Sequence, residues 1–179
     1  MAETPAGKLW IGRATFLAVA FAIIFAQLLP IDVRPDTWPF PDLLLAVTFV
    51  WVVRRPDYAP VLIIGAIFLL TDLLFQRPPG LWAALVVIAT EIVRTRSRGL
   101  RDFPLLLECL TVAGAIVALV VANRLVLSLA LTPQAPLGPT LIQMLGTIAI
   151  YPIVIPIARF VFGVTRPALG EVDTYGHRI

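Results

Sequence analysis

The run LLLECLTVAGAIVALVVANRLVLSLAL, residues 105–131, carries only two charged side chains, Glu108 and Arg124. An α-helix rises about 1.5 Å per residue and the hydrocarbon core of a membrane is about 30 Å thick, so roughly 20 apolar residues span it. The run therefore predicts a transmembrane helix. Five more apolar segments flank it in the sequence, at 14–31, 43–53, 60–75, 80–93 and 141–164.

Six such segments fill almost the whole chain and predict an all-α polytopic membrane protein. Hydrophobic residues make up 59% of the 179 residues and charged residues 14%, well below the roughly 25% charge of soluble domains. We expect one integral membrane domain over 1–179, with a retained first helix rather than a cleaved signal peptide. The segments 43–53 and 80–93 fall short of a full span, so they extend into their flanks, tilt, or are shielded by neighbours.

The basic residues predict the orientation. Eleven of the 14 Lys and Arg lie on one side of the six segments, two on the other, and Arg124 within the fifth. Because cytoplasmic loops are enriched in Lys and Arg, the side with eleven is predicted to be cytoplasmic, including tails at about 1–13 and 165–179. Those eleven are Lys8, Arg13, Arg54, Arg55, Arg94, Arg96, Arg98, Arg101, Arg159, Arg166 and Arg178.

A net charge of +3 and a pI near 9.6 do not indicate nucleic-acid binding, because topology alone places these basic residues at the ends of spans. The densest cluster, Arg94, Arg96, Arg98 and Arg101, favours contact with anionic lipid headgroups. Docking of a cytoplasmic protein is the alternative. The single cysteine, Cys109, cannot form an internal disulfide.

The first segment carries small residues at helical spacing: Ala14, Ala18, Ala22 and Ala26. Small residues repeated every fourth position let two helix backbones approach closely in lipid. Packing inside this protein's own bundle is the interpretation we favour. A docking face for another protein's helix, or a chance alignment in an alanine-rich helix, are the alternatives.

Proline and ionisable residues mark special positions inside the segments. Pro152 and Pro156 are predicted to kink the sixth helix or divide it into two pieces. Asp72 and Arg124 have opposite charge at a similar depth near the outer side, which predicts a structural ion pair, a capping role at the outer turn, or a ligand or partner contact. Glu91 and Glu108 lie near the arginine cluster, where interfacial contact with it is expected.

Catalysis finds no support in the residue types. The only histidine is His177, and the sequence contains no nucleophile–histidine pair, no cluster of metal ligands and no glycine-rich phosphate loop. We therefore expect neither an enzyme nor a protein that needs a cofactor.

Four stretches between residues 41 and 82 carry a family resemblance. PDLLL opens at Pro41, WVVRRPDYAP runs from Trp51 to Pro60, and GAIFLLTDLL is followed by PGLW, which ends at Trp82. Together with the length and the number of spans, they closely resemble MreD, the rod-shape-determining membrane protein family of bacteria, and RRPDY is similar to its alphaproteobacterial members.

This resemblance implies a non-enzymatic scaffold in the bacterial inner membrane. MreD-like proteins work with MreC, a single-span protein with a large periplasmic part, and with the cytoskeletal MreB, to which the link could be indirect. The assembly supports RodA, a glycan polymerase, and its class B penicillin-binding transpeptidase. Asp42, Asp72 and Gly80 match the family motif, which assigns them no chemical role.

The same resemblance implies a competing function. The MreD fold is similar to the substrate-binding S component of energy-coupling-factor vitamin transporters, and six short spans suit such a subunit. The outer loops offer few convergent polar groups for a vitamin, and 132–139 carries only Thr132 and Gln134. We therefore expect the scaffold, with solute binding as the alternative.

Overall fold

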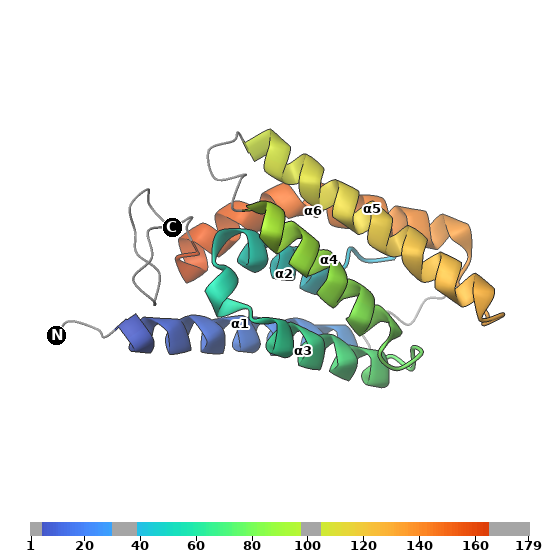
Figure 1. Ribbon diagram of the computed structural model, residues 1–179, viewed down its shortest axis with the longest axis horizontal. Helices are drawn as coiled ribbons and strands as arrows, with labels where there is room; N and C mark the ends of the chain where they lie inside the picture. The colour runs from blue at the N-terminus through green and yellow to red at the C-terminus, as the bar shows by residue number, and fades with distance from the viewer. Residues whose placement is uncertain (1–4, 30–38, 98–104, 165–179) are drawn as a thin grey trace.

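The computed structural model describes residues 5–29, 39–97 and 105–164, and this part of the chain consists of helices joined by turns and loops, without a strand (Figure 1). The order of elements is α1 (Pro5–Leu28), α2 (Leu43–Arg54), the short 3₁₀ helix η1 (Pro56–Tyr58), α3 (Val61–Leu74), α4 (Leu81–Ser97), α5 (Leu105–Leu129) and α6 (Leu137–Phe162). The six predicted helices are therefore confirmed.

Three of the helices are long and apolar enough to cross a membrane: Gly7–Leu28 within α1, α5, and α6. This indicates a multi-pass membrane protein. The shorter apolar helices are α2 and α3, with 12 and 14 residues, so each covers only about 18–21 Å at the usual rise. The prediction that the second segment falls short is confirmed. The fourth helix instead reaches Ser97 and has 17 residues.

The centre of the bundle is α2. Every residue from Leu44 to Arg54 is buried, because α1, α4 and α6 all pack against it. A helix covered on all sides needs apolar residues all round, and only Thr48 and Arg54 depart from that in this run. Its shortness is therefore explained by shielding from neighbouring helices, one of the three possibilities that the sequence left open.

The outer surface of the bundle is apolar. Large hydrophobic side chains are strongly exposed on several helices, among them Phe25, Leu62, Leu129 and Phe160. Contiguous apolar surface on this scale is rare in soluble monomers. It is the surface expected of helices that face lipid.

The helix α6 runs unbroken through Pro152 and Pro156, so of the two predicted outcomes, a kink or a division, the division into two pieces is wrong. Each interior proline removes one hydrogen bond, but α6 packs against α2, and Tyr151 and Ile155 are buried on either side of Pro152. Packing of this kind stabilises proline-containing membrane helices. The helix ends at Gly163, whose φ of 64° is left-handed.

Basic residues gather at one end of the bundle. We call this the basic end: Lys8, Arg13, Arg54, Arg55, Arg94, Arg96 and Arg159, located where α1 begins, α2 and α4 end, and α6 ends (Figure 1). The opposite end holds Arg77 and Arg124, which line a cavity described below. We call it the cavity end. Five of the basic residues that the sequence assigned to one side or the other lie outside the described residues: Arg34, Arg98, Arg101, Arg166 and Arg178.

Candidate functional site

At the cavity end, Asp72 of α3 caps the N-terminus of α4. Its Oδ2 accepts hydrogen bonds from the backbone N–H groups of Gly80, at 3.0 Å, and Ala83, at 3.2 Å. The first N–H groups of a helix have no partner within the helix, and a carboxylate there also suits the helix dipole. Gly80 has a φ of 85°, a conformation that favours glycine. One of the roles left open for Asp72, capping at the outer turn, is therefore observed.

The predicted pair of Asp72 and Arg124 is not formed. Arg124 instead donates to the hydroxyl of Thr140 at 3.0 Å and to the carbonyl of Ala135 at 3.2 Å. Gln134 returns a hydrogen bond to the carbonyl of Arg124. The prediction fails because each side chain has local partners: the α4 N-terminus donates to Oδ2 of Asp72, and the α5–α6 loop and α6 hold the Arg124 guanidinium.

Asp42 caps the N-terminus of α2, as Asp72 caps that of α4. Its Oδ1 accepts from the N–H of Leu45 at 2.9 Å, and its own N–H donates to the hydroxyl of Thr147 in α6 at 2.8 Å. Asp42 lies in the loop before α2, where desolvation raises the pKa of its carboxyl and the Leu45 N–H opposes that rise. All three motif positions, Asp42, Asp72 and Gly80, thus build helix starts at the cavity end.

Between these helix starts lies a cavity of about 330 Å³. Its apolar walls include Trp82, Ile116 and Met144, and its polar lining includes two arginines and several amide side chains. The polar members are Asp42, Gln76, Arg77, Asn123, Arg124, Gln134, Thr140, Gln143 and Thr147. The expectation of few convergent polar groups is wrong here, because residues from α5, α6 and the α3–α4 turn converge with those of the loop.

A buried polar group that the sequence did not predict joins three helices near the basic end. Glu108 of α5 pairs with Arg54 of α2 at 3.2 Å, with side-chain exposures of 1% and 9%, and accepts from the Tyr151 hydroxyl of α6 at 3.0 Å. Glu108 is therefore buried between helices rather than interfacial, and Arg98 and Arg101 of the arginine cluster lie outside the described residues. A buried carboxylate needs a charged or hydrogen-bonding partner, and Arg54 and Tyr151 supply both. The signal was available, since Arg54 and Glu108 have opposite charge at one depth.

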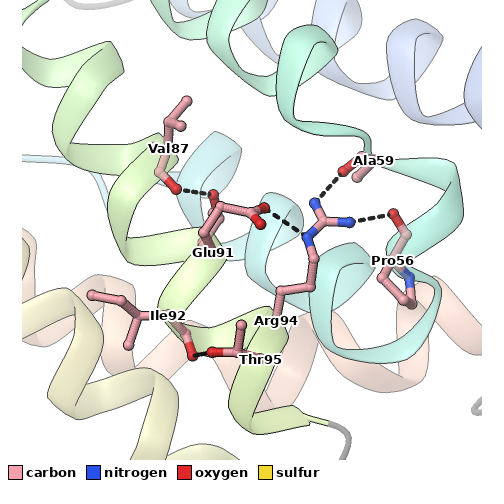
Figure 2. A network of polar contacts seen from close by, with 8 residues as sticks. Pro56, Ala59, Val87, Glu91, Ile92, Arg94 and Thr95 are labelled. Carbon is pink, nitrogen blue, oxygen red and sulfur yellow. Dashed lines mark hydrogen bonds and ion pairs between the residues drawn. The ribbon is translucent and has the colours of Figure 1, made fainter.

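Arg94 ties α4 to the turn between α2 and α3 (Figure 2). It donates to Glu91 at 2.7 Å and to the carbonyls of Pro56 and Ala59 at 2.7 and 2.6 Å. Contact between Glu91 and the arginine cluster is confirmed. Arg94 therefore uses its N–H donors to bind the protein's own turn, rather than lipid headgroups or another protein. Arg96 is exposed, and Arg98 and Arg101 lie outside the described residues.

The alanine stripe of α1 faces away from the bundle. Ala14, Ala18, Ala22 and Ala26 are all exposed, so the favoured interpretation of packing within the bundle is wrong. The buried face is a second stripe with the same spacing, formed by Gly12, Phe16, Ala20 and Ile24. Phe16 packs against Trp51 of α2, with ring centroids 6.0 Å apart. Gly12 lies so close to Tyr58 that an added Cβ would meet its ring at 2.5 Å.

Within residues 5–29, 39–97 and 105–164, no group of three or more His, Cys, Asp or Glu side chains could hold a metal ion. Comparisons of the chain with protein-family models, with curated proteins and with solved structures found no match. The resemblance to MreD therefore stays a prediction from the residues.

Proposed function

We propose that this chain is a non-enzymatic membrane scaffold of the bacterial cell-elongation complex, of the MreD type. It binds the membrane helix of an MreC-like single-span protein and thereby supports peptidoglycan synthesis by RodA and its class B transpeptidase. MreB filaments are engaged indirectly. The chain itself needs no cofactor in this role. It lies in the inner membrane with the basic end in the cytoplasm, as the excess of Lys and Arg at that end favours.

The observation that carries the proposal is the exposed alanine face of α1. Lipid gives no hydrophobic drive for helix association, so close packing between small residues is a principal attraction between membrane helices. α1 is apolar enough to span a membrane, and its four exposed alanines lie beside the large exposed side chains of Phe21 and Phe25. Such a surface offers a shallow strip along which a partner helix can approach the α1 backbone.

A scaffold of this kind works by proximity. Holding the partner in the membrane raises its effective concentration near the polymerase without new chemistry. Each of the motif residues Asp42, Asp72 and Gly80 fixes a helix start at the cavity end. Those starts keep the loops there in defined positions beneath the partner's periplasmic domain, provided that this end faces the periplasm.

The test is co-purification of the MreC-like partner with variants of the exposed face. Ala18→Phe and Ala22→Phe should leave a folded protein, since both positions are exposed, but should reduce recovery of the partner about tenfold or more, in line with the loss of close helix packing. Ala118→Phe is the matched control, because Ala118 is an exposed alanine on α5. Equal recovery with all three variants argues against the docking face.

Orientation has its own test. A periplasm-specific reporter fused after residue 136, between α5 and α6, should be active, and one fused after residue 97 should be inactive. The opposite pattern would place the basic end outside and overturn this part of the proposal.

One observation favours the second candidate, a solute-binding subunit similar to the S component of a vitamin transporter. The cavity of about 330 Å³ gathers polar side chains, and its volume is at the lower end of the range for small-molecule sites. A small ligand that co-purifies with the chain, seen by mass spectrometry, supports this candidate. Recovery of the MreC-like partner supports the scaffold.

A further inference from the structure

Two arginines line the same cavity from different elements. Arg77 follows α3 and Arg124 belongs to α5. The side chain of Arg77 is exposed and lies against the rings of Phe75 and Trp82, at 5.8 and 5.7 Å from their centroids. Arg124 is held by Thr140 and Ala135. Each guanidinium is therefore positioned by its surroundings before any ligand arrives.

The positive charge of the cavity exceeds the negative charge. Asp42 is the one acidic residue of its described lining, and the Oδ1 of that carboxylate already accepts from Leu45. Neither arginine forms an ion pair with any carboxylate in the part of the chain that the structure describes. Asp72, outside the lining, also interacts electrostatically with Arg77, but its Oδ2 already accepts from Gly80 and Ala83. The lining itself holds two cations and one acid in a partly enclosed space, which favours an anionic ligand.

The apolar wall and the volume of the cavity limit the kind of molecule that carries the anionic group. Trp82, Ile116, Val120 and Met144 give the cavity an apolar wall. A volume of about 330 Å³ is small for a dinucleotide or a large cofactor, and suits a headgroup-sized molecule. The lining thus calls for an anionic group joined to an apolar or partly apolar body.

We propose that this cavity binds a phosphate-bearing amphiphile or phosphate ester, with Arg77 and Arg124 on the phosphate oxygens. A planar carboxylate is satisfied by the fork of a single guanidinium, whereas a phosphate has further oxygens for a second one. The phosphate is either the headgroup of a membrane phospholipid or a soluble phosphate ester. The site does not depend on the scaffold proposal, because a scaffold and a transport subunit can each hold such a ligand.

The experiment uses the full chain in nanodiscs of phosphatidylcholine. Phosphatidylglycerol is added to the disc in one arm, and glycerol 3-phosphate is titrated into the buffer in the other. Native mass spectrometry counts retained phosphatidylglycerol, and Trp82 in the cavity wall gives a fluorescence signal for the soluble probe. Trp10, Trp38 and Trp51 are replaced by Phe in a parallel sample, so that the signal comes from Trp82.

The variant is Arg77→Gln and its matched control is Arg96→Gln. Arg77 and Arg96 are both exposed, but Arg96 lies at the basic end, so both changes remove one charge and only one alters the cavity. Arg77 makes ring contacts but holds no helix together through its side chain, so the variant should fold. Arg124→Gln is the second variant, with circular dichroism as its folding check.

We expect Arg77→Gln to weaken binding of one probe about tenfold, the loss of a single charge-assisted contact, with Arg96→Gln unchanged. If the affected probe is phosphatidylglycerol, the source is the membrane. If it is glycerol 3-phosphate, the source is soluble. Two results together would overturn the site: equal retention of phosphatidylglycerol in Arg77→Gln and Arg96→Gln, and no saturable change of Trp82 fluorescence with glycerol 3-phosphate. Neither outcome bears on recovery of the MreC-like partner, so the two proposals fail separately.

Discussion

The carboxylate of Asp72 accepts a hydrogen bond from the backbone N–H of Gly80 at 3.0 Å, across the turn that joins α3 to α4. Asp72 is fully buried, and the same oxygen also accepts from Ala83. An acid that looked like a candidate for ligand binding is thus an N-terminal cap supplied by the preceding helix. It ties two adjacent helices together at the cavity end.

This cap predicts that hydrogen-bond acceptance is the main contribution of Asp72 to stability, with a smaller contribution from its charge at the helix N-terminus. Asp72→Ala leaves the N–H groups of Gly80 and Ala83 without their acceptor and should lower stability by about 0.5–2 kcal/mol, the usual cost of losing an N-cap. Asp72→Asn keeps a carbonyl acceptor and should lose much less. Thermal unfolding in detergent measures both. Equal losses for Ala and Asn would contradict the cap.

The separate partners of Asp72 and Arg124 predict independence. Sites that share no partners have additive effects within about 0.3–0.5 kcal/mol. The double variant Asp72→Asn with Arg124→Gln should therefore be destabilised by the sum of the two single changes. A double variant that recovers stability would show a direct interaction between the two charges and would contradict the contacts described above.

The buried group around Glu108 predicts a large loss when one partner is removed. Arg54→Met removes the guanidinium that pairs with the buried Glu108 carboxylate and should cost about 3–5 kcal/mol. Arg54→Met combined with Glu108→Leu removes both charges and should recover most of that loss. Glu91→Gln is the control, since the Glu91 side chain is 39% exposed and such pairs contribute only about 0–1 kcal/mol. Unfolding midpoints that rank Glu91→Gln as the most harmful change would refute this assignment.

The contact of α1 with η1 predicts a steric effect at Gly12. An added Cβ would lie 2.5 Å from the ring of Tyr58, so Gly12→Ala should cost about 1–3 kcal/mol, as overpacking usually does. Gly114→Ala in α5 is the matched control, because nothing lies within 4 Å of its added Cβ. It should be neutral or stabilising, since alanine favours helix over glycine. Similar unfolding temperatures for the two variants would rule out the tight contact.

The number and kind of elements could be predicted from the sequence. Apolar runs bounded by polar or proline-rich turns are strong signals, and all six predicted helices are present. The basic residues also predicted which helix ends lie together, and Arg13 and Arg94 meet the turn around η1 as that grouping requires.

The buried face of α1 could not be predicted in the same way. Both the exposed stripe of Ala18 and Ala22 and the buried stripe of Phe16 and Ala20 repeat every fourth residue. Small residues alone gave no reason to prefer one side, because burial depends on what α2 and η1 present to the helix. Here the large side chain of Trp51 receives Phe16.

The partners of the buried charged residues also could not be predicted from their depth in the membrane. Asp72 and Arg124 match in depth and charge, yet Asp72 accepts from backbone N–H groups, and Arg124 donates to one loop carbonyl and to the Thr140 hydroxyl. Arg54 and Glu108 match equally well and do pair, and Glu108 also accepts from the Tyr151 hydroxyl. The free N–H groups at a helix N-terminus compete with basic side chains for a carboxylate. Depth and charge alone therefore do not predict the partner.

The central claim is that the exposed face of α1 holds a partner's membrane helix. Site-specific photo-crosslinking in intact cells tests it most directly, with a photoreactive amino acid in place of Ala22 and, as control, in place of Ala118. Both positions are exposed. The account predicts a crosslink to the MreC-like protein from position 22 and none from position 118. Crosslinking from 118 alone, or from neither position while the two proteins still co-purify, would contradict it.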